Sequence, residues 1–212
     1  MDPCPGTVGH LNLTTMSENT WNVITDSHDL LRNAAALISD VNADAPTPCS
    51  AWTVTQVLQH AVGDQLAWAA AIGVGTGPSE NPFTPSGLLE ESVDELIESA
   101  LATAATAWAG VRADDEAVPT PLPQGALPAP TAAAACALDA AVHAWDIVVA
   151  LGQPGGLTDG LAVQLLPAAR SIVEPLRQFG AYAAALPVGA ADDHVAELLR
   201  YLGRDPQWSA SH

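Results

Sequence analysis

The most strongly patterned stretch of the chain, residues 130–152, is apolar around nearly the whole circumference of a helix. Part of this surface is a ridge at helical spacing, formed by Leu138, Val142, Trp145 and Val149. Other apolar residues lie elsewhere around the turn, namely Ile147, Val148 and Leu151. A helix that is apolar on nearly all sides is a buried helix. We therefore predict that this helix is the centre around which the rest of the chain is organised.

One line of polar residues interrupts the apolar surface of this helix. Asp139, His143 and Asp146 follow one another at spacings of four and three residues, which places their side chains on one face. Leaving a charge unpaired in a core costs on the order of several kcal/mol or more. These three side chains therefore need partners, which are hydrogen-bonding groups, opposite charges or a metal ion. Asp139 and His143, four residues apart on a helix, can direct two ligands at one ion.

Helical periodicity recurs along the rest of the chain, in segments separated by runs rich in Gly, Pro and Ser. Thr53 with Gln56 three residues later is a capping box, which marks a helix start. Pro167 and Pro175 each remove a backbone hydrogen bond, so we expect kinks or a break where they fall. The periodicity predicts helices at residues 17–41, 53–73, 88–111, 158–180 and 191–203 in addition to the central one.

These segments predict an all-α protein, because β-branched alternating runs are few. Residues 17–152 are expected to form a four-helix bundle, and residues 153–212 a smaller helical C-terminal segment. Residues 1–16 are rich in Gly, Pro, Thr and Asn, and we interpret them as a flexible tail. The loop at residues 73–87 is interpreted as a connector, with a flap over a site as the alternative.

Two histidines outside the central helix lie in predicted helices. His60 falls on the flank of an apolar face, and Asp64 follows one turn later. His28 is interpreted as an exposed or rim residue. If the helices carrying His60 and His143 meet inside a bundle, His60 joins Asp139 and His143 as a set of two imidazoles and one carboxylate. This set suits zinc, and also nickel or iron, and leaves at least one coordination position open.

Alternatives to the metal site remain open at this point. Asp139 and His143 could be an ordinary hydrogen-bonded pair four residues apart, with no metal. Asp146, one turn beyond His143, could orient a metal ligand from outside the coordination sphere. Cys136 lies one turn before Asp139, and we interpret it as a buried, inert thiol.

Charge and cysteine content limit the partners and the compartment. The net charge of -18 repels nucleic acid and anionic membranes, so neither is expected as a partner. Cys4, Cys49 and Cys136 are odd in number and irregularly spaced, which argues against a disulfide framework and favours the cytoplasm. We see neither a signal peptide nor a convincing membrane span. The length allows a core without oligomerisation and leaves a homodimer open.

Three fragments of the sequence resemble a known family when they are taken together. They are TPCSAWTVTQVLQHAVG at residues 47–63, VHAWDIVVALGQP at residues 142–154 and LLRYLGRDPQW at residues 198–208. In this order and at these separations they resemble the mycothiol-dependent maleylpyruvate isomerase family, part of the DinB/YfiT-like group of helical metalloenzymes. The resemblance extends over most of the chain, from about residue 17 to residue 208.

The resemblance implies a DinB-like four-helix bundle that holds a divalent metal, usually zinc. Matched motif by motif, the metal ligands fall on His60, Asp139 and His143. Asp139 is one methylene shorter than the glutamate that is common in the family, which raises the question of its reach. The resemblance also implies mycothiol as cosubstrate and a small electrophile as the molecule that it attacks. The metal has a role in such a reaction because coordination favours the thiolate, the nucleophilic form of a thiol. The six arginines are candidates for binding substrate anions; Arg204 among them matches a family motif, and a structural cap is the alternative role for it.

Three functional hypotheses follow. The first is a metal-dependent S-transferase or thiol-dependent isomerase that uses mycothiol or a similar low-molecular-weight thiol. The second is a metal-dependent hydrolase of the same fold, which activates water instead of a thiol. The third is a small-molecule-binding bundle whose metal site has decayed, an idea that rests mainly on the short Asp139 side chain. The first accounts for all three ligand-type residues.

Overall fold

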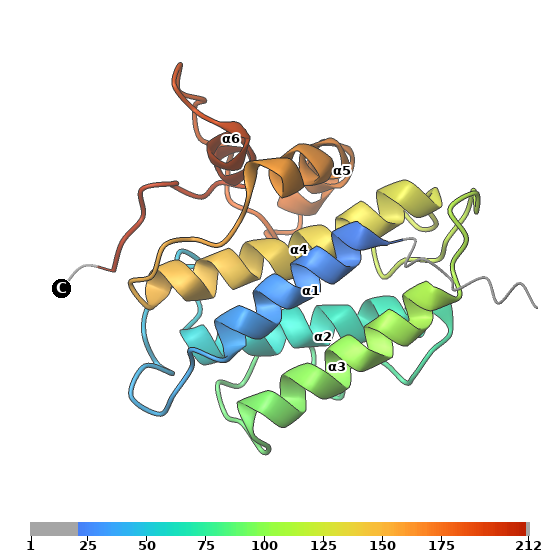
Figure 1. Ribbon diagram of the computed structural model, residues 1–212, viewed down its shortest axis with the longest axis horizontal. Helices are drawn as coiled ribbons and strands as arrows, with labels where there is room; N and C mark the ends of the chain where they lie inside the picture. The colour runs from blue at the N-terminus through green and yellow to red at the C-terminus, as the bar shows by residue number, and fades with distance from the viewer. Residues whose placement is uncertain (1–20, 211–212) are drawn as a thin grey trace, which may run out of the picture.

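The computed structural model describes residues 21–210, and within them it contains six α-helices and no strand. Figure 1 shows α1, α2, α3 and α4 packed side by side, with α5 and α6 together against one side of α4. This arrangement confirms the predicted all-α class and the four-helix bundle with a smaller helical C-terminal segment. The helices are α1 Asn22–Ala35, α2 Val54–Ile72, α3 Val93–Ala109, α4 Ala129–Ala150, α5 Asp159–Arg177 and α6 His194–Tyr201.

The helix α4 is the centre of the packing, as its sequence predicts. It contacts α1, α2 and α5, and most of its residues are buried. Its many alanines let neighbouring backbones approach closely, and two hydrophobic clusters lie along it. Among the described helices, α4 has the length and hydropathy to cross a membrane, yet 78% of its apolar window is buried inside the protein. Its hydropathy is therefore explained by its position in the core.

Capping side chains set two of the helix starts. The predicted box at the start of α2 is present, with Thr53 and Gln56 bonding reciprocally to each other's backbone. Ser92 and Glu95 form an equivalent box at the start of α3. The predicted start of that helix at residue 88 was therefore too early. The first helix is also shorter than residues 17–41: it ends at Ala35, and the predicted residues 17–20 lie outside the described part of the chain.

The expected break in the fifth helix is absent, because α5 runs continuously through Pro167 and Pro175. Both prolines are exposed, so the carbonyls that lose a backbone donor face water. The opposite face of α5 buries apolar side chains, including Leu165 and Ile172, against the rest of the protein. Packing of this face stabilises the helix despite the missing hydrogen bonds.

The prediction for His28 was wrong. Its side chain is buried, with 5% of the residue exposed, and its Nε2 lies 2.9 Å from Gln65 Oε1 on α2. Gln65 Nε2 in turn donates to the carbonyl of Cys136 on α4, at 3.2 Å. This chain of bonds joins three helices of the bundle, and burial lowers the pKa of His28 more than its bond to Gln65 raises it.

Candidate metal centre

The packing of α2 on α4 brings His60, Asp139 and His143 together. The Nε2 atoms of His60 and His143 each lie 3.4 Å from Asp139 Oδ1. The three donor atoms lie within 4.8 Å of one another. Only 6% of His60 and 7% of His143 are exposed, so the cluster is at the edge of the core and not on the open surface. The three residues that the sequence nominated as ligands are thus neighbours.

Each imidazole is held through its other ring nitrogen. His60 Nδ1 lies 2.9 Å from the carbonyl oxygen of Pro82, and His143 Nδ1 lies 3.0 Å from Asp146 Oδ2. A carbonyl oxygen can only accept, so His60 Nδ1 carries a proton and donates it. The same tautomer suits His143 beside a carboxylate. When both rings are neutral, both Nε2 atoms present lone pairs to the cluster, which is the arrangement of metal-binding histidines.

Asp139 completes the fit to a cation. Its Oδ2 is one of the few buried side-chain nitrogen or oxygen atoms in residues 21–210 that have no hydrogen-bond partner. The two 3.4 Å contacts of Oδ1 are longer than the roughly 2.9 Å of a well-formed N–H···O bond. Burial opposes ionisation, but the charges of His143 and His60 hold the pKa of Asp139 well below its usual range. A buried carboxylate with a free oxygen beside two imidazoles suits a divalent metal.

His143 has the electrostatics expected of a group next to a carboxylate. Burial works against its protonation, but Asp139, together with bonds to Asp139, Asp146 and Cys49, raises the pKa of His143 well above its usual value. In the absence of a metal the ring therefore takes up a proton. A bound cation would replace that proton, because a ligand histidine must be neutral.

Asp146, the predicted orienting residue, bonds to His143 and is itself held by Arg204 in the C-terminal segment. Arg204 binds it through two nitrogens, with Nε 2.9 Å from Oδ1 and Nη2 2.7 Å from Oδ2. Asp146 is fully buried, yet Arg204 and His143 hold the pKa of Asp146 well below its usual range. The chain Arg204–Asp146–His143 links the C-terminal segment to the cluster. The structure thus gives Arg204 a buried ion pair with Asp146, a role that the sequence did not predict.

Cys49 is one of the residues of this region that sequence reasoning missed. Its Sγ lies 3.2 Å from Asp146 Oδ2 and 3.3 Å from Arg204 Nη2. With His143 and Asp146 it forms a second group of ligand-type atoms within 4.8 Å. The Arg204 guanidinium already supplies the positive charge at this second group, so it is a poor site for a metal. The sequence signal that could have identified Cys49 was its place, with Trp52, in one of the fragments that resemble the family.

Aromatic rings and one loop close around His60. The ring centroid of His60 lies 4.7 Å from that of Trp52 and 5.4 Å from that of Phe83. Phe83 and Pro82 belong to the loop at residues 73–87, so this connector also forms part of the wall of the cluster. Its composition alone could not distinguish that role from a plain connection.

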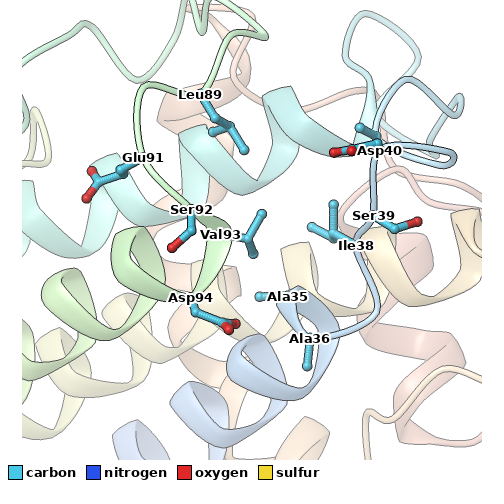
Figure 2. Close-up of a pocket in the computed structure, with 11 residues that line it drawn as sticks. Ala35, Ala36, Ile38, Ser39, Asp40, Leu89, Glu91, Ser92, Val93 and Asp94 are labelled. Atoms are coloured by element: carbon cyan, nitrogen blue, oxygen red, sulfur yellow. The ribbon is translucent and has the colours of Figure 1, made fainter.

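The remaining candidates lie apart from the cluster. Cys136 is fully buried and bonds Gln65, and burial raises the pKa of its thiol well above the usual value, in line with an inert cysteine. A cavity of about 510 Å³ lies between the end of α1 and the start of α3, and Figure 2 shows the residues that line it. Its labelled charged residues are the acids Asp40, Glu91 and Asp94, and it shares no residue with the histidine cluster.

Comparison with known families agrees with this architecture. Residues 24–148 match the family model described as the mycothiol maleylpyruvate isomerase N-terminal domain, a span that runs from α1 to near the end of α4. The chain belongs to the mycothiol maleylpyruvate isomerase family. The matched region contains His60, Asp139, His143 and Asp146, whereas Arg204 lies beyond it. The resemblance seen in the sequence is thereby confirmed.

Two relatives of this family member come from Mycobacterium tuberculosis. The uncharacterised protein MT0763 of strain CDC 1551 / Oshkosh is 36% identical over 150 residues, which are 66% of this chain and 74% of the relative. The uncharacterised protein Rv0738 of strain ATCC 25618 / H37Rv matches with the same figures.

A solved structure shares the fold. The crystal structure of a histidine-to-alanine mutant of the mycothiol-dependent maleylpyruvate isomerase aligns with a TM-score of 0.52 over 69% of this chain. The aligned part is 64% of that protein, so the chain spans less than two thirds of its length. At 17% identity the likeness concerns the fold alone.

Proposed function

We propose that the protein is a metal-dependent enzyme that uses mycothiol, or a similar low-molecular-weight thiol, as nucleophile on a small electrophile. The reaction is either S-transfer or a thiol-dependent isomerisation. The observation that carries the proposal is the convergence of two oriented imidazoles on Asp139, whose Oδ2 has no other partner. Membership of the mycothiol maleylpyruvate isomerase family supports the choice of thiol.

His60, Asp139 and His143 would hold the metal, with zinc proposed first and nickel or iron as alternatives. When bound, the metal supplies positive charge that favours thiolate over thiol at neutral pH. The short side chain of Asp139 still reaches the cluster, because its Oδ1 lies 3.4 Å from Nε2 of both His60 and His143. Reach alone therefore does not support the idea of a decayed site.

The surrounding residues would position these ligands and limit access to them. The Pro82 carbonyl and Asp146 fix the two ring orientations, and Arg204 fixes Asp146. Trp52 and Phe83 cover the sides of His60 with apolar surface, which lowers the local dielectric and strengthens electrostatic effects in the cluster. Placement and charge stabilisation are then the protein's contributions to rate.

Metal content is the first test. Untagged protein purified without chelator is analysed for elements, alongside His60→Ala, Asp139→Ala and the control His194→Ala, an exposed histidine on α6. We expect about one metal ion per chain in the wild type and the control, and loss from the two cluster variants, as a three-ligand site requires. A wild-type protein that stays metal-free after soaking in zinc, nickel or iron and dialysis would overturn the proposal.

Thiol dependence is the second test and separates the proposal from the hydrolase. The loaded protein is assayed with maleylpyruvate, taken from the name of the related isomerase, and with a panel of alkylating electrophiles. Each assay is run with and without mycothiol. We expect turnover only when the thiol is present. Turnover of ester or amide substrates without any thiol would instead favour water activation at the same cluster.

A further inference from the structure

All arginines of the chain are paired with acids of the same chain. The sequence has six Lys and Arg residues, all of them arginine, and all lie within the part that the structure describes. The ion pairs are Arg32 with Asp29 and Glu98, Arg112 with Asp114, Arg170 with Glu197, Arg177 with Glu174, Arg200 with Asp192 and Arg204 with Asp146. The residues that the sequence offers for binding substrate anions are therefore already occupied.

Arg204 is the arginine that the structure connects to the cluster, and its guanidinium is used inside the protein. Its Nε and Nη2 donate to the two carboxylate oxygens of Asp146. Nη2 also lies 3.3 Å from Cys49 Sγ, and Nη1 lies 3.5 Å from the carbonyl oxygen of Leu202. An arginine that recognises a carboxylate typically uses two parallel N–H donors, and here Asp146 takes both.

The other charges around the cluster disfavour an anionic substrate. Asp139 and Asp146 each place a carboxylate beside His143. The divalent metal of the proposed function adds two positive charges, which Asp139 and the thiolate balance. A substrate carboxylate would then be buried without a partner of opposite charge, which is strongly unfavourable. The net charge of -18 also repels anions at longer range.

Aromatic surface is what the protein presents beside the cluster instead. Phe83 is 59% exposed, although its ring centroid lies only 5.4 Å from that of His60. The half-buried Trp52 lies near both imidazoles, with its ring centroid 4.7 Å from that of His60 and 6.4 Å from that of His143. Small-molecule sites are lined mainly by apolar and aromatic side chains. The two rings therefore suit the apolar part of a ligand.

The segment that carries Phe83 is fixed on α2. The carbonyl oxygen of Pro82 accepts a hydrogen bond from His60 Nδ1 at 2.9 Å. Gly63 permits this close approach, since a Cβ there would lie 2.9 Å from Pro82 Cγ. Further hydrogen bonds join α2 to the same segment, from Gln56 to Pro85, from Gln59 to Leu88 and from Gly87 to Gln59. Phe83 is thus held beside His60 as a preformed surface.

We propose that the electrophile on which this protein acts is uncharged and has an apolar, ring-sized body that packs against Trp52 and Phe83. This inference rests on the proposed thiol chemistry and names the class of its second substrate. A dicarboxylate such as maleylpyruvate is then a poor substrate, because all six guanidiniums are already paired.

The first experiment compares two unreactive ketones that differ by one carboxylate, acetophenone and 4-acetylbenzoate. Ligand-observed NMR gives their dissociation constants on zinc-loaded protein with mycothiol present. The proteins are the wild type, Phe83→Ala, Phe83→Arg and the matched controls Phe179→Ala and Phe179→Arg, at the other phenylalanine, which is also exposed. Metal content is measured for each.

The expected results concern the ratio of the two dissociation constants. The wild type and both controls should bind acetophenone at least about 10-fold more tightly than 4-acetylbenzoate, because the carboxylate meets like charge. Phe83→Ala should weaken acetophenone binding by about 2- to 10-fold, the usual range for one aromatic contact. Phe83→Arg should narrow or reverse the preference, because it places a guanidinium beside the site.

Turnover is measured with phenacyl bromide and 4-carboxyphenacyl bromide, from the initial rate at which the mycothiol conjugate forms. The S–C bond forms, the C–Br bond breaks, bromide leaves with the electron pair, and the thiol proton passes to the buffer. Each rate is divided by the rate without protein, which corrects for the intrinsic reactivity of the bromide. The rate enhancement should be at least about 10-fold larger for phenacyl bromide, for the same electrostatic reason.

The two measurements separate this inference from the proposed function. Equal or tighter binding of 4-acetylbenzoate by the wild type would overturn the uncharged substrate class, even if thiol-dependent turnover is found. Equal effects of Phe83→Ala and Phe179→Ala would overturn the role of Phe83. Selective binding of acetophenone through Phe83, with no thiol-dependent turnover of either bromide, would overturn the proposed function and leave Trp52 and Phe83 as an apolar binding surface.

Discussion

Two buried polar groups lie in the same bundle, and they are built on different principles. The first is the His28 network, in which His28, Gln65 and Cys136 bond to one another across α1, α2 and α4. The second is the ligand cluster of His60, Asp139 and His143, where two imidazole Nε2 atoms converge on a carboxylate whose Oδ2 has no hydrogen-bond partner. The network satisfies its groups internally, whereas the cluster leaves groups available for something that binds.

The difference teaches how to distinguish a structural histidine from a functional one. Both His28 and His143 are buried, so burial does not separate them. What separates them is the charge around each. His28 has a neutral amide partner and a lowered pKa, while His143 lies between two carboxylates and has a raised pKa, despite its burial. A buried carboxylate with an unpartnered oxygen lowers stability unless something binds there, so this arrangement favours a binding role.

The largest effect should come from exchanging the two histidines for alanine. His143→Ala removes a ligand, so we expect loss of the metal and of thiol-dependent turnover. His28→Ala should keep the metal but lower the free energy of unfolding by about 1–3 kcal/mol, because Gln65 loses a buried partner. Elemental analysis and urea unfolding of the two variants make the comparison. If both lose the metal, or if neither does, the distinction between network and cluster is wrong.

Arg204→Gln tests how far the C-terminal segment supports the cluster. Removing the guanidinium leaves the fully buried Asp146 without its cation, which should lower the free energy of unfolding by about 3–5 kcal/mol. Loss of orientation at His143 should weaken metal affinity by about 10- to 100-fold. Denaturant unfolding and competition with a metal indicator measure the two effects. Unchanged metal affinity in folded Arg204→Gln would contradict the chain Arg204–Asp146–His143.

The pH dependence should reverse when metal binds. In the metal-free protein the pKa of folded His143 is raised, so its stabilising effect is complete below about pH 6.5 and is lost as pH rises through the raised folded value. The metal-loaded protein should instead gain stability over this range, because protons and metal compete for His143. Melting curves of chelator-treated and zinc-loaded protein between about pH 6 and pH 8 measure both slopes. Parallel slopes would argue against metal binding at His143.

Much of the fold could be predicted from the sequence, because helical period and burial follow from local pattern. The all-round apolar α4 and the capping box of Thr53 are examples. The candidate ligands Asp139 and His143 also follow from their spacing on one helix, α4. His60 was added to them because a second helix was expected to pack there and because of the family resemblance. Metal binding itself stays a prediction.

The parts that the sequence did not predict depend on contacts between distant segments. His28 was misplaced because its partner Gln65 lies on another helix and leaves no trace in the local pattern. Cys49, Pro82 and Arg204 reach the cluster region from loops whose paths are set by tertiary packing. Ser92 was overlooked as a cap, so the start of α3 was placed among the acids that precede it.

The smallest effect should come from Cys136, the thiol of the His28 network. Cys136→Ala removes a weak S–H donor to Gln65 Oε1, but that oxygen keeps its bond to His28. We expect a loss of about 1 kcal/mol in the free energy of unfolding, with metal content unchanged. In native protein, alkylating reagents should reach the half-buried Cys49 before the fully buried Cys136, and mass spectrometry of the peptides gives the order. Loss of metal in Cys136→Ala would mean that the network and the cluster act as one unit.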